Sequence, residues 1–109
     1  MVFAVDFDGT LYFGGNSFPQ IGEPNIKLIE FLKSRREFGD KLILWTARHG
    51  KFLDDAVEWC ASFGLYFDAI NDDVPEIIEF WGDDRSKKVT ADYYIDDRSL
   101  KPYEVFDVK

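Results

Sequence analysis

The chain has 109 residues, the length of one domain, and 46% of them are hydrophobic, so it can bury a core. Its formal charge of -8 disfavours non-specific binding to anionic membranes and to nucleic acid, except at a phosphorylated end. The single cysteine, Cys60, excludes an internal disulfide and fits a reducing compartment. No apolar run approaches the roughly 20 residues of a membrane span, and no signal peptide is recognised, so we expect a soluble, cytoplasmic protein.

The first half of the chain predicts a strand, a loop, a helix and a second strand. Val2–Val5 is a continuous apolar run, as in a strand buried on both faces. The stretch Tyr12–Pro24 is rich in glycine, proline and aromatic residues, which is typical of a loop or short flap. Pro24-Asn25 opens a helix with an apolar stripe, Gly39-Asp40 closes it, and Leu42–Trp45 is the second strand.

The second half continues the alternation. Helical spacing of apolar residues predicts a helix over Phe52–Phe63 and a short one over Pro75–Trp81, in which Trp81 faces inward. Apolar runs predict strands at Leu65–Ile70 and Ala91–Ile95, and weak alternation over Tyr103–Val108 suggests an edge strand. Strands alternating with helices predict one α/β domain, residues 1–109, with a mostly parallel sheet and right-handed crossovers.

In such sheets ligands bind beyond the carboxyl ends of the strands. Several reactive side chains are expected at that edge: Asp6, Asp8, Thr46, Arg48, Asp96 and Asp97. Two carboxylates at the end of a buried strand cost free energy unless their charge is compensated. A bound cation compensates it, and such a cation typically serves chemistry on an anionic substrate, usually a phosphate. Because Asp-Gly is also common in solvated turns, Asp6 and Asp8 alone leave both interpretations open.

The longer stretch Val5-Asp6-Phe7-Asp8-Gly9-Thr10-Leu11 resembles the first motif of the haloacid dehalogenase-like (HAD-like) superfamily of hydrolases. Ile95-Asp96-Asp97 is similar to the fourth motif, an acidic pair that closes a short apolar strand. Asp72-Asp73 also follows an apolar run, after one intervening residue, and Asp72 is the alternative acid. The pair Asp54-Asp55 is typical of a helix start, where the helix dipole favours acids, and the pair Asp83-Asp84 is typical of a surface loop.

The second and third motifs are shorter. Thr46 resembles the Ser or Thr of the second motif, whose hydroxyl binds a phosphoryl oxygen, although on its own it fits a simple cap. The third motif is a lysine upstream of the acidic pair. Lys87 and Lys88 both qualify, and we prefer Lys88, directly before Val89, as the residue that neutralises phosphate. Alternatively, both lysines offset Asp83-Asp84.

The resemblance implies a three-layer Rossmann-like core with strand order three-two-one-four and a phosphatase mechanism. Asp6 would be the nucleophile, forming an aspartyl-phosphate, and Asp8 the general acid and base. Mg²⁺ would be held by the Asp6 carboxylate, the Asp8 backbone carbonyl and Asp96, with Asp97 a ligand or just outside the ligand set. An aspartate at position 8, rather than a threonine, favours phosphatases over transport ATPases.

Substrate contacts are predicted at Gly9, Thr46, Arg48 and Lys88. An arginine two residues beyond Thr46 could grip a phosphate oxygen or a substrate carboxylate with both arms of its guanidinium. His49 beside it is a further candidate. The alternative for both is a solvated loop.

Residues 12–23 are too few for the cap domain that many members of the superfamily carry, so the chain resembles a capless member with a short flap. An open site implies a large substrate, or a partner or second subunit that acts as a lid. The expected function is a Mg²⁺-dependent phosphomonoester hydrolase with a phosphorylated substrate of unknown class. The alternatives are a non-catalytic regulatory module that binds metal or phosphoryl groups, and a phosphotransferase.

Overall fold

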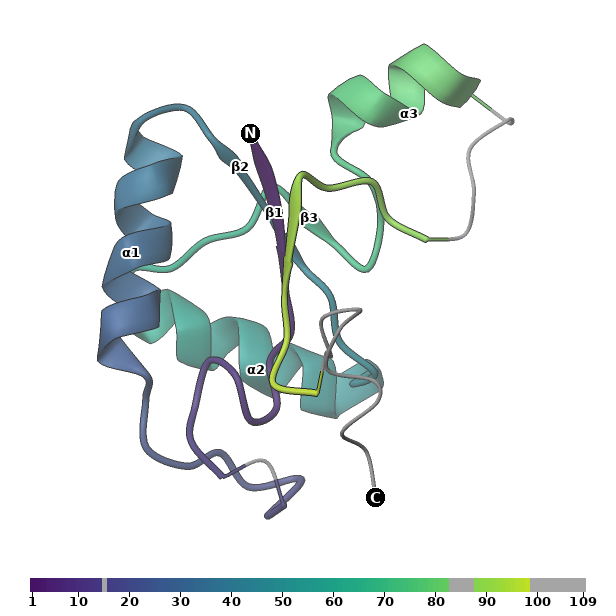
Figure 1. The fold of residues 1–109 in the computed structure, drawn as a ribbon. Coiled ribbons are helices and arrows are strands. Elements are labelled where there is room, and N and C mark those ends of the chain that lie inside the picture. The colour runs from purple at the N-terminus through teal and green to yellow at the C-terminus, as the bar shows by residue number, and fades with distance from the viewer. Residues whose placement is uncertain (15, 83–87, 99–109) are drawn as a thin grey trace, which may run out of the picture.

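The computed structural model describes residues 1–14, 16–82 and 88–98. Lys87 and the expected edge strand over Tyr103–Val108 lie outside these residues. The described residues form strands and helices in alternation (Figure 1): β1 (Val2–Val5), α1 (Ile26–Glu37), β2 (Lys41–Leu44), α2 (Gly50–Ser62), β3 (Ala69–Ile70), α3 (Pro75–Trp81) and β4 (Tyr93–Ile95).

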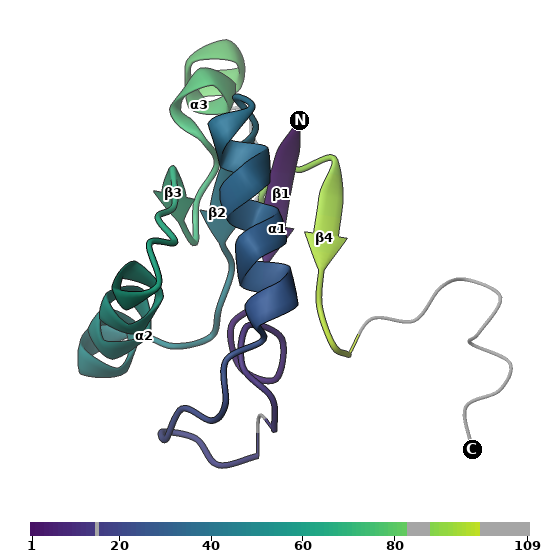
Figure 2. The same ribbon diagram turned by 90° about the vertical axis from the view of Figure 1, so that its left-hand side faces the viewer.

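The strands of the described chain form one parallel sheet in the order β3-β2-β1-β4. This confirms the predicted α/β class and strand order. Val5 pairs with Leu44 of β2 and with Ile95 of β4, so these three strands end at the same level. Figure 2 shows β1 and β4 pointing the same way, toward the end of the molecule that holds the loop after β1. Residues that directly follow the strands therefore meet at one edge.

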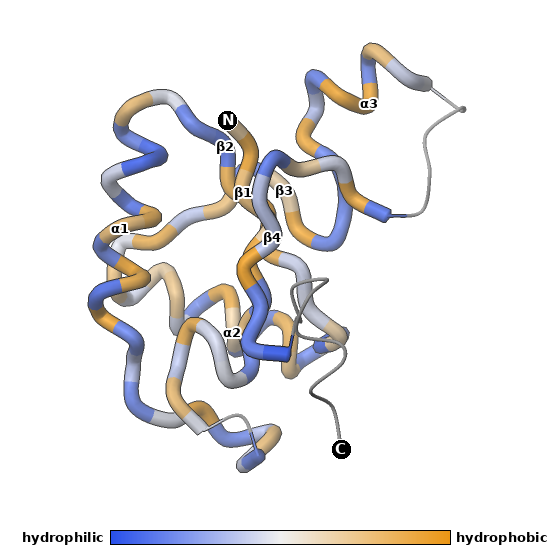
Figure 3. The backbone as a smooth tube through the Cα atoms, viewed as in Figure 1, coloured by the Kyte–Doolittle hydropathy of each residue, from blue (hydrophilic) through white to orange (hydrophobic). Residues whose placement is uncertain are grey.

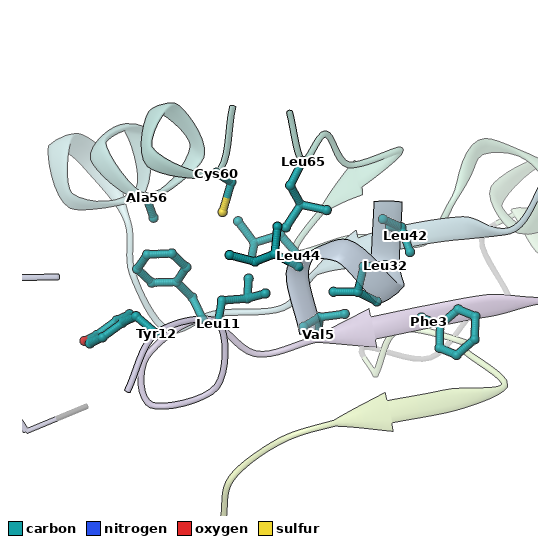
Figure 4. Close-up of a cluster of buried hydrophobic side chains, with 12 residues drawn as sticks. Phe3, Val5, Leu11, Tyr12, Leu32, Leu42, Leu44, Ala56, Cys60 and Leu65 are labelled. Carbon is teal, nitrogen blue, oxygen red and sulfur yellow. The ribbon is translucent and has the colours of Figure 1, made fainter. Parts of the chain in front are cut away.

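Helices cover both faces of the sheet, and Figure 1 shows α1 and α3 on opposite sides of it. The cluster under α1 and α2, drawn in Figure 4, includes Phe3, Val5, Leu32, Leu44 and Cys60. A smaller cluster on the other face includes Ala4, Ile43, Val74 and Val89, with Ile77 of α3 packed against it. Because successive strand residues point to opposite faces, the continuous apolar run of β1 serves both clusters.

The start of α1 is tied to the loop that follows β1. The Asn25 side chain accepts a hydrogen bond from the Leu28 N–H (3.3 Å) and donates one to the Thr10 carbonyl (3.2 Å). It therefore caps the helix and fixes the chain that leaves the sheet edge. Gly39, with a φ of 98°, follows the helix end as predicted. None of the helices in residues 1–14, 16–82 and 88–98 is long and apolar enough to cross a membrane.

Three expectations were wrong. The strand expected over Ala91–Ile95 is confined to Tyr93–Ile95. The strand expected over Leu65–Ile70 is reduced to Ala69–Ile70, because the Asp68 carboxylate accepts the Leu42 N–H (2.8 Å) that a neighbouring strand would otherwise bind. Trp81 does not face inward. It is 51% exposed and packs edge-on against Phe80, because α3 has only seven residues and meets the core through Ile77.

Candidate active site

Three carboxylates meet at the carboxyl edge of the sheet. Asp6 follows β1, and Asp96 and Asp97 follow β4. Figure 3 shows the chain changing from hydrophobic to hydrophilic at the end of β4. One carboxylate oxygen from each lies within 4.8 Å of the others. Among the described residues, this is the one group of acidic, histidine or cysteine side chains spaced to hold a metal ion, and Asp72 is not part of it.

Backbone hydrogen bonds hold these acids in place. The Asp6 N–H donates to the Ile95 carbonyl at 2.9 Å, which joins the ends of β1 and β4. The buried Thr10 hydroxyl accepts the Asp97 N–H at 3.1 Å, and the Arg98 N–H donates to Asp96 Oδ1 at 2.8 Å. In the sequence, Thr10 is a member of the motif Val5–Leu11. Its bracing of the acidic pair was not predicted.

The group is electrostatically unfavourable without a cation. Burial raises the pKa of Asp6 to about 6, and the charges of Asp96, Asp97 and Asp8 act in the same direction, against a hydrogen bond from the Phe7 N–H. Three carboxylates at this spacing are the oxygen donors that hard divalent cations prefer. The residues present therefore fit a divalent metal ion.

In metal-free protein, Asp6 is expected to make the free energy of unfolding fall as pH rises from about 4 to 6. Its pKa is about 6 when folded and 3.8 when unfolded, so the folded state binds more protons in this window. The stability is present below pH 4 and lost as pH rises through 6. Two pKa units correspond to at most about 3 kcal/mol, and partial solvation reduces this to about 1–2 kcal/mol.

Urea denaturation in a chelator, at several pH values, measures this effect. The difference in unfolding free energy between wild type and Asp6→Asn should change by the stated amount across the window. Asp54→Asn, the same substitution at an exposed position outside the acidic group, is the matched control. A flat difference for Asp6→Asn would contradict the electrostatic description.

Asp8 faces a different partner. Its carboxylate accepts hydrogen bonds from Arg48 Nη2 (2.8 Å to Oδ1) and Nε (3.0 Å to Oδ2), and from the Tyr12 hydroxyl (2.6 Å). Burial alone would raise the pKa of Asp8, but the hydrogen bonds from Arg48 and Tyr12 and the guanidinium charge outweigh it and hold that pKa below its usual range. The Asp8 side chain is therefore poised as a carboxylate.

Arg48 is only 4% exposed, and its guanidinium has several partners. Besides Asp8, its guanidinium donates to the carbonyls of Phe52 and Pro19, each at 3.3 Å. Its Cζ lies 4.9 Å from the ring centroids of both Phe7 and Phe18, so the cation stacks between two aromatic rings. The predicted contact of Arg48 with substrate stays a prediction. The Asp8 pairing was not predicted, because the sequence places both residues at one sheet edge but does not show which way a loop side chain turns.

Thr46 and Gly9 lie where the sequence placed them, in the loops beyond β2 and β1. The Thr46 N–H donates to Asn71 Oδ1 (2.7 Å) and its Oγ1 accepts the Arg48 N–H (3.1 Å), which leaves the hydroxyl hydrogen available to an acceptor. Gly9 has a φ of 79°, which favours glycine, and it shapes the turn in which the Thr10 and Leu11 N–H groups donate to the Phe7 carbonyl.

Lys88 lies in the segment that leads into β4. Its ammonium is 4.6 Å from the centroid of the Tyr94 ring, a cation–π contact. Its role toward a phosphoryl group stays a prediction, and the choice between Lys88 and Lys87 stays open because Lys87 lies outside the described residues.

No known family model and no curated protein matches the chain. A solved structure does: a conserved protein from Bacteroides thetaiotaomicron, with 42% sequence identity and a TM-score of 0.78. The match covers 98% of this chain and 89% of that one. The chain therefore belongs to the same family as this conserved protein.

Proposed function

We propose that the protein is a Mg²⁺-dependent phosphomonoester hydrolase of the HAD-like superfamily. The observation that carries the proposal is the gathering of Asp6, Asp96 and Asp97 within 4.8 Å at the carboxyl edge of a parallel sheet. Asp8, two residues beyond Asp6, supplies a second acidic function beside the group. The strand order β3-β2-β1-β4, with Asp6 on a central strand, agrees with this class.

Asp6 is the nucleophile in this proposal. Its carboxylate oxygen attacks phosphorus, the bond from phosphorus to the ester oxygen breaks, and an aspartyl-phosphate forms. Bound Mg²⁺ would offset the repulsion between this carboxylate and the phosphate. Asp6, Asp96 and Asp97 would hold it, together with the Asp8 backbone carbonyl. The Thr46 hydroxyl and the Lys88 ammonium would bind phosphoryl oxygens.

Asp8 moves the protons. Its pairing with Arg48 and Tyr12 favours the carboxylate, which is the form that takes a proton from the water attacking the aspartyl-phosphate. In the first step the same oxygen atoms deliver a proton to the departing ester oxygen. The contacts with Arg48 and Tyr12 thus favour the base form, and the acid form needed for the first step is the minor one, reached when Asp8 takes a proton from solvent water.

A cytoplasmic location belongs to the same proposal. Cys60 is buried in the core, and burial raises the pKa of its thiol to about 12, so it is held as an unreactive apolar side chain. Such a cysteine needs no oxidising compartment.

Phosphate release from p-nitrophenyl phosphate tests the function. We expect turnover with Mg²⁺, loss of turnover in a chelator, and full recovery when Mg²⁺ is restored. Equal release with and without the metal would contradict the proposal. If neither Mg²⁺ nor trifluoroberyllate binds, the non-catalytic module is the better description, and transfer of the phosphoryl group to added alcohols would identify a phosphotransferase.

A further inference from the structure

A cavity of about 270 Å³ opens directly beside Asp8. Four segments build it: the loop after β1, the flap, the loop after β2 and the first turn of α2. Its lining residues are Asp8, Phe18, Ala47, Arg48, His49 and Phe52. Neither the metal-binding group nor the phosphoryl contacts proposed above use Phe18 and Phe52.

Two aromatic rings form the apolar wall of this cavity. Phe18 from the flap and Phe52 from α2 meet edge-to-face, with ring centroids 5.2 Å apart. Both rings stay partly open to solvent, at 52% and 39% exposure, although each packs against the other. Rings arranged in this way offer edges and faces to a third ring, because aromatic groups prefer edge-to-face or offset contacts.

The charged residues at the cavity cancel each other. The Arg48 guanidinium is committed to Asp8 and to the carbonyls of Phe52 and Pro19, and it is almost completely buried. The Asp8 charge is matched by Arg48 in turn. With Asp8 ionised, this pair adds no net charge to the cavity, and the two aromatic rings suit an uncharged apolar group.

The cavity has the size of a single aromatic ring with room for substituents. An apolar cavity of about 150 Å³ is enough to hold benzene, and this one is about 270 Å³. Its position matters as much. In the proposed function Asp8 gives its proton to the departing ester oxygen, so the group attached to that oxygen extends past Asp8 into this space.

We propose that the cavity is the leaving-group pocket of the enzyme and that the substrates are aryl phosphate monoesters. This inference rests on the proposed function. The phosphoryl group lies at the acidic edge, and the aromatic ring attached to its ester oxygen packs against Phe18 and Phe52. The product alcohol is an uncharged phenol.

Binding of two phosphonates in the presence of Mg²⁺ tests the pocket without any turnover. Benzylphosphonate carries a carbon in place of the ester oxygen of phenyl phosphate, and ethylphosphonate is its counterpart without the ring. By titration calorimetry, we expect wild type to bind benzylphosphonate about 10-fold more tightly, the value of a good aromatic contact. Phe52→Ala and Phe18→Ala should each reduce this ratio to about 3-fold or less, chiefly by weakening the binding of benzylphosphonate.

Phe13→Ala is the matched control, because Phe13 is another exposed ring of the flap that does not line the cavity. It should keep the wild-type ratio. Equal affinity for the two phosphonates in wild type, or no binding of either, would overturn the pocket. Phosphate release from p-nitrophenyl phosphate, measured in parallel, reports separately on the proposed function.

Discussion

Replacing Asp6 with asparagine is expected to reduce phosphate release by at least about 1,000-fold, because an amide cannot form the aspartyl-phosphate. The side chain keeps its size, and its half-buried position at the end of β1 tolerates a neutral group. Loss of one of three repelling carboxylates even favours the metal-free fold. The loss of activity should therefore come without a loss of stability, as urea denaturation can verify.

A comparison with Asp96→Asn separates the nucleophile from a metal ligand. Asp96 belongs to the same acidic group but follows β4 and is exposed. Its substitution should raise the Mg²⁺ concentration needed for half-maximal rate, and saturating Mg²⁺ should restore most of the rate. For Asp6→Asn, no Mg²⁺ concentration should do so. If Mg²⁺ restored the rate of Asp6→Asn, Asp6 would be a metal ligand only and another residue would have to be the nucleophile.

The acidic group could be predicted from the sequence because it depends on topology. Parallel strands end at one edge, so residues directly after β1 and β4 had to meet once the strand order was known. The paired register of Val5 with Ile95 places Asp6 beside Asp96 without any detail of side-chain packing. Both ends of α1 were predictable for a similar local reason, since Asn25 and Gly39 act on the helix ends beside them.

The surroundings of Asp8 could not be predicted, because they depend on how loops fold onto one another. The substrate contact of Arg48 stays a prediction. What the sequence did not show is that its side chain faces Asp8 and lies against the rings of Phe7 and Phe18. The sequence places Tyr12 at the start of the flap, and in the structure it is buried with its hydroxyl donating a hydrogen bond to Asp8. Tertiary contacts set the direction of a side chain at a loop position, and the local sequence pattern does not predict those contacts.

Arg48→Met is expected to lower the free energy of unfolding by about 2–4 kcal/mol. Removing one member of a buried ion pair leaves the other charge without compensation, which typically costs about 3–5 kcal/mol, and the partial exposure of Asp8 reduces this figure. The stacking between Phe7 and Phe18 is lost as well. Arg36→Met is the control, since its ion pair with Asp68 is more exposed, and it should cost about 1 kcal/mol or less.

The double variant Arg48→Met/Asp8→Asn shows whether the ion pair is the cause. If the cost of Arg48→Met comes from the stranded Asp8 charge, neutralising Asp8 in the same protein should recover at least about 1 kcal/mol, a non-additive result expected of residues in direct contact. Strict additivity would assign the whole loss to packing of the guanidinium between the two rings. Because the same pairing holds Asp8 as a carboxylate, its energy also sets how readily Asp8 can carry the proton that the proposed first step requires.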